Sequence, residues 1–126
     1  MNQAELDYQN HNATISVPLV KPKKDFIDFQ ELKENEIKVL RFEDYEKFMK
    51  YVSADFVYEI VEKCNADFLG YCENEVLYPD TLPTAIEIVS KAIKQKKNAV
   101  FKDYLEQTKE MMELALSLGT FVQFDF

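Results

Sequence analysis

Histidine, glycine and tryptophan are nearly missing from this chain of 126 residues, which has one His, two Gly and no Trp. Histidine is the side chain most often used as a general acid or base, so a catalytic site has little to draw on. With only Gly70 and Gly119, neither common phosphate loop, G-x-G-x-x-G or G-x-x-x-x-G-K, can be formed. These absences favour a binding protein over an enzyme.

Metal ligands and disulfide partners are also scarce. Cys64 and Cys72 are the only cysteines, too few for a disulfide scaffold and without a second ligand pair at zinc-site spacing. His11 lies alone in a polar N-terminal stretch, where an exposed, mobile imidazole is expected. We therefore expect reduced, buried thiols, no metal, no cofactor and no catalytic residue.

One row of carboxylates has the spacing of a metal site on a helix. Glu106, Glu110 and Glu113 are four and three residues apart. No Glu-x-x-His motif accompanies them, and Lys109 lies among them. A solvated helix face is the favoured interpretation.

No uncharged run approaches the roughly 20 apolar residues that a transmembrane helix requires. The longest, 8–20 and 114–124, are shorter and interrupted by polar residues. Residues 1–10 carry Glu5 and Asp7 where a signal peptide has a basic and then an apolar region. A cytoplasmic protein without a membrane partner is expected.

The chain is rich in acids and aromatic residues. It has 23 acids against 15 Lys and Arg, a net charge of -8, ten Phe and seven Tyr. A hydrophobic fraction of 47% in a chain of this length predicts one globular domain over residues 1–126, with loose order allowed for residues 1–12. The charge repels nucleic-acid phosphates and attracts basic surfaces, so direct nucleic-acid binding is disfavoured.

Apolar and polar residues alternate in three short stretches, which predicts strands at 14–20, 36–42 and 120–126. Residues 75–78, before Pro79, can form a further short strand although they show no strong period. The first stretch contains Pro18, which cannot donate to a sheet ladder, so we expect that strand at an edge. The sheet is predicted to form from the strands near 37–42 and 120–126, joined by 14–20.

Apolar residues recur every three or four positions in the rest of the chain, which predicts helices. The first covers 43–64, as one helix or as two that meet near Ser53. The second begins at Asp80 or Thr81, and the third ends before Gly119, an expected left-handed cap. The result is an α+β fold, mostly helical, with a small and mainly antiparallel sheet.

Two further expectations concern packing and helix ends. The core is predicted to include Phe56, Phe101, Leu105 and Met112. The segment 26–29, Phe-Ile-Asp-Phe, is interpreted as a cap over the core. The basic cluster of the second helix is interpreted as a complement to the negative end of the helix dipole. That cluster consists of Lys94, Lys96 and Lys97.

The strongest candidate for a functional surface is a segment without bases. No Lys or Arg occurs from residue 64 to residue 90, while acids and tyrosines alternate there. Tyrosine is enriched at interface centres, and acids steer basic partners. An ordinary acidic loop is an equally good interpretation. The predicted partner-binding residues are Asp67, Tyr71, Glu73, Glu75, Tyr78 and Asp80.

In whole-chain character this small, acidic, aromatic-rich chain resembles the immunity proteins that bacteria pair with toxins in contact-dependent inhibition and other polymorphic toxin systems. The resemblance implies a non-catalytic inhibitor that covers the active site or substrate-binding surface of a basic toxin domain, typically a nuclease. No motif carries it, so it assigns no binding residue. Two alternatives stay open: an acidic nucleic-acid mimic that inhibits a host defence protein, and an accessory subunit of an assembly.

Overall fold

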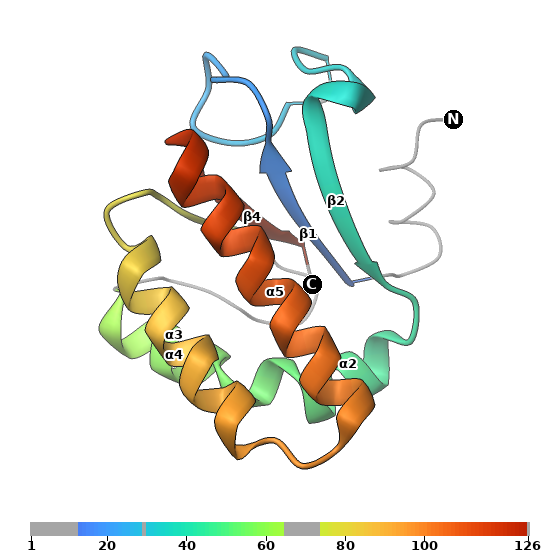
Figure 1. Cartoon of the computed structure of the whole chain (residues 1–126). Coiled ribbons are helices and arrows are strands. Elements are labelled where there is room, and N and C mark those ends of the chain that lie inside the picture. Colours follow the sequence, from blue (N-terminus) through green and yellow to red (C-terminus); the bar gives the residue numbers. More distant parts are fainter. Residues whose placement is uncertain (1–12, 29, 65–73, 126) are drawn as a thin grey trace.

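A four-stranded antiparallel sheet in the order β2-β1-β4-β3 organises the computed structural model, which describes residues 13–28, 30–64 and 74–125. Helices cover one face of this sheet: Figure 1 shows α5 lying across the strands with α4 beside it. The strands are β1 (Ala13–Pro18), β2 (Ile37–Phe42), β3 (Asn74–Leu77) and β4 (Val122–Asp125). The helices are α2 (Tyr45–Tyr51), α3 (Val57–Lys63), α4 (Leu82–Gln95) and α5 (Ala99–Leu118), with short 3₁₀ turns η1 (Glu34–Glu36) and η2 (Ser53–Asp55). The α+β prediction, mostly helical with an antiparallel sheet, is confirmed.

Local sequence signals fix the ends of the long helices. The Asn98 side chain accepts hydrogen bonds from the backbone N–H groups of Val100 and Phe101, at 3.0 and 3.1 Å, and so caps α5. Pro83 lies in the first turn of α4, where its missing N–H costs nothing. At the other end of α5, Gly119 adopts φ 69°, the left-handed cap that the sequence predicts.

Replacing Gly119 with alanine should lower the free energy of unfolding by about 1 kcal/mol, because a Cβ disfavours the left-handed region. No atom lies within 4 Å of the Cβ position, so the cost is one of backbone conformation alone. Urea denaturation measures it. Gly119→Asn should cost less than the alanine variant, since asparagine tolerates this region, and an equal cost for both would contradict the explanation.

The segment 43–64 forms two helices. α2 ends at Tyr51, η2 turns the chain, and α3 begins at Val57. The Ser53 hydroxyl donates to the Met49 carbonyl at 2.9 Å, which places a polar side chain on the last turn of α2. The break near Ser53 that the sequence left open is therefore present.

The sheet has apolar side chains on both faces. The face toward the helices contributes Ile15, Val17 and Phe124 to the main core. Because side chains alternate along a strand, Ile37 points to the other face, where it packs with Ile27, Leu32 and Phe121 in a second, smaller cluster. Ile27 and Leu32 come from the loop 19–33. Of the segment 26–29, interpreted as a cap, Ile27 is buried in this second cluster and Phe26 is 47% exposed, while Phe29 lies outside the described residues.

Three of the four predicted core residues are fully buried: Phe56, Leu105 and Met112. Phe101, the fourth, is only half-buried and packs against the edge of the core. Phe101 lies in the first turn of α5 near the end of α2, where its ring stacks on that of Tyr51 with centroids 5.1 Å apart.

The predicted position of the first strand is also wrong. β1 is interior, between β2 and β4, and the strands near 37–42 and 120–126 do not pair directly. Pro18 is tolerated because β4 pairs only with Thr14, Ile15 and Ser16, so the proline lies beyond that ladder. β3 joins the other side of β4 and extends the sheet by a strand that the predicted arrangement left out.

Candidate functional site

The turn between β3 and α4 contains the two predicted partner-binding residues whose side chains are described. Tyr78 and Asp80 are both exposed there. The backbone N–H and the hydroxyl of Thr81 both donate to the Tyr78 carbonyl, at 3.0 and 2.9 Å, which fixes the turn. Within the described residues β3 pairs only with β4, so this turn follows an outer strand of the sheet.

The other four predicted residues are placed only in part. Glu75 lies in β3 with its backbone opposite Phe124, and its side chain is outside the description. Asp67, Tyr71 and Glu73 lie outside the described residues altogether. The surface is therefore defined by the turn, and we call Tyr78 and Asp80, with Asp25 and Phe26 of the adjoining loop, the acidic tyrosine surface.

Tyr78 is held in a fixed orientation although 42% of it is exposed. Its hydroxyl donates to the backbone carbonyl of Asp25 at 3.0 Å. Its ring meets Phe121 edge-on, with centroids 6.2 Å apart. An exposed aromatic side chain with both ends fixed loses little rotamer freedom when a partner binds, which favours affinity.

The contact with Asp25 brings the loop 19–33 to the site. The backbone N–H of Ile27 donates to Gln123 Oε1 of β4 at 2.8 Å, in a buried position. The Thr120 hydroxyl donates to the Pro18 carbonyl at 2.9 Å, where the loop begins. These bonds leave Phe26, 47% exposed, beside the turn that carries Tyr78. The sequence does not indicate that Phe26 lies near Tyr78, because Asp25 and Tyr78 are 53 positions apart.

Replacing Gln123 with leucine should lower the free energy of unfolding by about 1–3 kcal/mol, because it leaves the buried Ile27 N–H without an acceptor. The matched control is Gln107→Leu, which removes only a surface bond to Asp103 and should change stability by less than about 0.5 kcal/mol. Chemical denaturation of both variants gives the comparison, and equal losses would show that the loop does not depend on Gln123.

Titration shifts in the described residues reflect structural contacts. A hydrogen bond from Lys24, together with one from the Gln30 N–H, lowers the pKa of Asp28. The same hydrogen bond between Lys24 and Asp28 raises the pKa of Lys24. Burial raises the pKa of the Cys64 thiol, whose sulfur lies 3.9 Å from the Thr81 carbonyl oxygen. A thiol with a raised pKa is a poor nucleophile at neutral pH.

No cluster of three or more His, Cys, Asp or Glu side chains that could hold a metal occurs in 13–28, 30–64 or 74–125. Glu106, Glu110 and Glu113 are all exposed along α5, as the solvated-face interpretation requires. His11 and Cys72 lie outside the described residues. Among the helices that the structure describes, none is long and apolar enough to cross a membrane.

The β3–α4 turn and the adjoining part of the loop 19–33 form one surface. It presents carboxylates and two exposed aromatic rings on a framework fixed by backbone and side-chain hydrogen bonds. Comparison with known proteins found no matching family model, no matching curated protein and no matching solved structure.

Proposed function

We propose that this protein is a non-catalytic inhibitor that binds a basic protein, in the first place a cognate toxin domain with nuclease activity, and covers its active site or substrate-binding surface. The observation that carries the proposal is the acidic tyrosine surface, where the fixed, exposed Tyr78 stands beside Asp80. It belongs to a segment without Lys or Arg from residue 64 to residue 90.

Electrostatics supports this kind of partner. The segment 64–90 contains no Lys or Arg, and the whole chain carries -8. A nuclease binds phosphates through Lys and Arg, so an acidic surface can occupy the same cleft. Complementary charge raises association rates to roughly 10⁸–10⁹ M⁻¹s⁻¹ at low salt, which suits an inhibitor that has to intercept a toxin before it acts.

The aromatic residues supply the apolar part of the contact. Tyr and Trp, with Arg, dominate the binding energy of many interfaces, and they act from positions that are well packed and shielded from water. Tyr78 and Phe26 are both near half-exposed and close to the same backbone segment at Asp25. We propose them as the apolar centre of the contact, with Asp25 and Asp80 at its rim. Lys24, which lies over the Phe26 ring at 5.6 Å, also borders this centre.

The nucleic-acid mimic is the second candidate, and a row of exposed acids along α5 favours it. Asp103, Glu106, Glu110 and Glu113 follow one another at intervals of three and four residues, and all are exposed. A protein that recognises a phosphate backbone would bind this row rather than the β3–α4 turn. The two candidates therefore place the partner on different surfaces and can be separated by mutation.

Affinity capture from cells of the source organism, followed by mass spectrometry, tests the proposal. Three baits are compared: the unaltered chain, Glu73→Lys/Glu75→Lys, and Glu106→Lys/Glu110→Lys. The two variants make the same change in net charge. A basic protein captured by the first and third baits but lost from the second supports the proposal. Loss from the third bait alone favours the mimic, and capture of only acidic proteins contradicts both.

A further inference from the structure

The turn between α4 and α5 has the opposite charge character to the acidic tyrosine surface. Residues 88–102 contain five lysines and no acid. They lie at the end of α4 away from Tyr78 and Asp80, and at 1.5 Å per residue this helix of 14 residues separates the two ends by about 21 Å. Figure 1 shows the α4–α5 turn at the far end of both helices from the loop 19–33.

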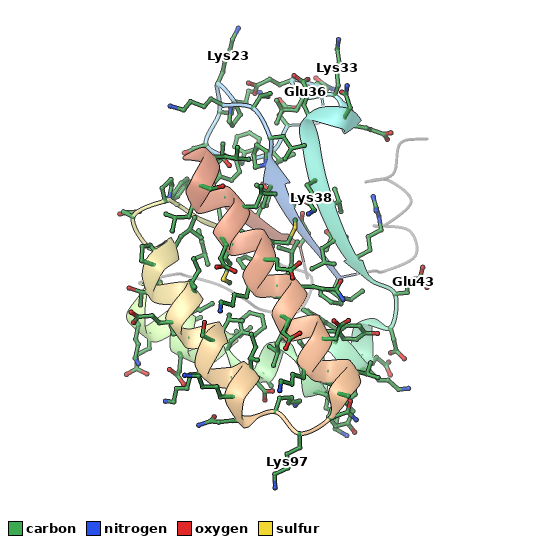
Figure 2. The ribbon with its side chains drawn as sticks, in the orientation of Figure 1. Lys23, Lys33, Glu36, Lys38, Glu43 and Lys97 are labelled. Atoms are coloured by element: carbon green, nitrogen blue, oxygen red, sulfur yellow. The ribbon has the colours of Figure 1, made fainter. Side chains whose placement is uncertain are left out.

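Two of these lysines are engaged within the molecule. Lys96 forms an ion pair with Asp55 at 2.9 Å and lies over the Phe101 ring at 5.6 Å. Lys91 is 3.9 Å from Glu59. Within the described part of the chain, no ion pair involves the other three, which are all exposed: Lys94, Lys97 and Lys102. Figure 2 shows Lys97 extending from the turn into solvent.

Helix dipoles do not account for these positions. α4 ends at Gln95, so only Lys94 lies in its last turn, where a cation is favourable. Lys97 lies beyond the helix. Lys102 lies at the N-terminal end of α5, where the dipole disfavours a cation. The helix-dipole explanation therefore applies to Lys94 and does not extend to Lys102.

Apolar side chains accompany the free lysines. Val100 is 56% exposed and directly precedes Phe101, whose ring stacks on the 39%-exposed Tyr51. Lys50 lies over the Tyr51 ring at 5.2 Å. The Asn98 cap and the Lys96–Asp55 pair fix the backbone of the turn. We call this surface the lysine corner: Lys50, Tyr51, Lys94, Lys97, Val100 and Lys102.

We propose that the lysine corner is a second interaction surface, which binds an acidic protein segment carrying an apolar side chain that packs against Val100. Charge complementarity identifies the partner, since the exposed lysines of the elements that meet at this turn match carboxylates, and the exposed Val100 matches an apolar side chain. This surface is independent of the proposed inhibition, which uses the other end of α4 and a partner of opposite charge.

The whole-molecule charge decides between a protein segment and a nucleic acid. A nucleic acid is long enough to extend past the lysine corner. Its phosphates would then be repelled by the rest of a chain with net charge -8. A short acidic protein segment is small enough to contact only the lysine corner and so avoids this repulsion. A second copy of this chain, docked by its own acidic segment, would make a head-to-tail contact that continues into open chains.

Site-specific photo-crosslinking in cells of the source organism tests the proposal. A benzophenone amino acid replaces Val100 in the full chain, and a matched control carries it at Leu116, 39% exposed on the same helix about 24 Å away at the rise of an α-helix. We expect a crosslinked product from position 100 and none from position 116. The partner peptide in that product should have a net negative charge. Lys97→Glu/Lys102→Glu should reduce its yield at least about tenfold.

Two controls keep the result specific. Lys21→Glu/Lys23→Glu makes the same charge change at the opposite end of the molecule, where Figure 2 shows Lys23, and should leave the yield unchanged. Glu73→Lys/Glu75→Lys should also leave it unchanged, which separates this surface from the proposed inhibitory one. A product with nucleic acid, with a second copy of the chain or with a basic segment would overturn the proposal. So would a yield at position 100 no higher than at position 116.

Discussion

Replacing Leu105 with alanine should lower the free energy of unfolding by about 2–5 kcal/mol, because the surrounding core closes only partly around the cavity that forms. Leu105 is completely buried on the inner face of α5, in the same core as Ile15 and Phe124 of the sheet. A loss of this size is a large fraction of the stability of a small protein. Urea or guanidinium denaturation, followed by circular dichroism, measures it.

Leu116→Ala is the matched control on the same helix. Leu116 is 39% exposed, so the same substitution removes little buried surface and should cost less than about 1 kcal/mol. Similar denaturation midpoints for the two variants would mean that α5 does not present its Leu105 face to the sheet, and the packing described above would be wrong.

The parts of the fold that the sequence predicts well depend on local signals. Asn98 and Gly119 mark the two ends of α5 because a side-chain cap and a left-handed cap need only neighbouring residues. Alternation along 36–42 places Ile37 and Val39 on one face of the strand and Leu40 and Phe42 on the other, and these two pairs pack in different clusters; the second cluster was not predicted.

The parts that the sequence does not predict depend on long-range pairing. Pro18 indicates an edge strand, but whether a proline disturbs a sheet depends on where the pairing with the neighbouring strand ends. The pairing of β1 with β4 ends at Ser16, before the proline. The docking of the loop 19–33 depends on Gln123, whose bond partner Ile27 is 96 positions away. No pattern within either segment identifies the other.

The composition of the sequence indicates where the candidate site lies but does not predict its geometry. The absence of Lys and Arg from 64 to 90 indicates a surface that includes Tyr78 and Asp80, and both residues are exposed. Phe26, their aromatic neighbour, was interpreted only as part of a cap, since its exposure depends on how the loop is held. The basic cluster Lys94, Lys96 and Lys97 is interpreted from the sequence as part of the last turn of α4, whereas α4 ends at Gln95.

Glu73→Lys/Glu75→Lys should slow association with the proposed basic partner by about tenfold or more at low salt, because charges near an interface act mainly on the rate of encounter. Glu75 lies in β3, three residues before Tyr78, and Glu73 precedes that strand in the sequence. Stopped-flow fluorescence gives the rate, and circular dichroism verifies the fold.

The control for total charge is Glu106→Lys/Glu110→Lys. Each variant reverses two acids, so both take the net charge from -8 to -4. The α5 variant should lose no more than about threefold in association rate, because its charges lie on a different element from the turn. Equal slowing by both variants would indicate a general charge effect without a defined surface.

The most direct test of the central claim is the salt dependence of the association rate between this protein and the basic partner captured from its cells. If the acidic tyrosine surface, together with Glu73 and Glu75 that precede it in the sequence, steers the encounter, the rate should fall steeply as ionic strength rises from about 0.01 to 0.15 M, over which the screening length shortens from about 30 to 8 Å. Glu73→Lys/Glu75→Lys should flatten this dependence, and Glu106→Lys/Glu110→Lys should largely preserve it. A rate that is independent of salt, or a dependence that the Glu73 and Glu75 reversals leave unaltered, would contradict the account.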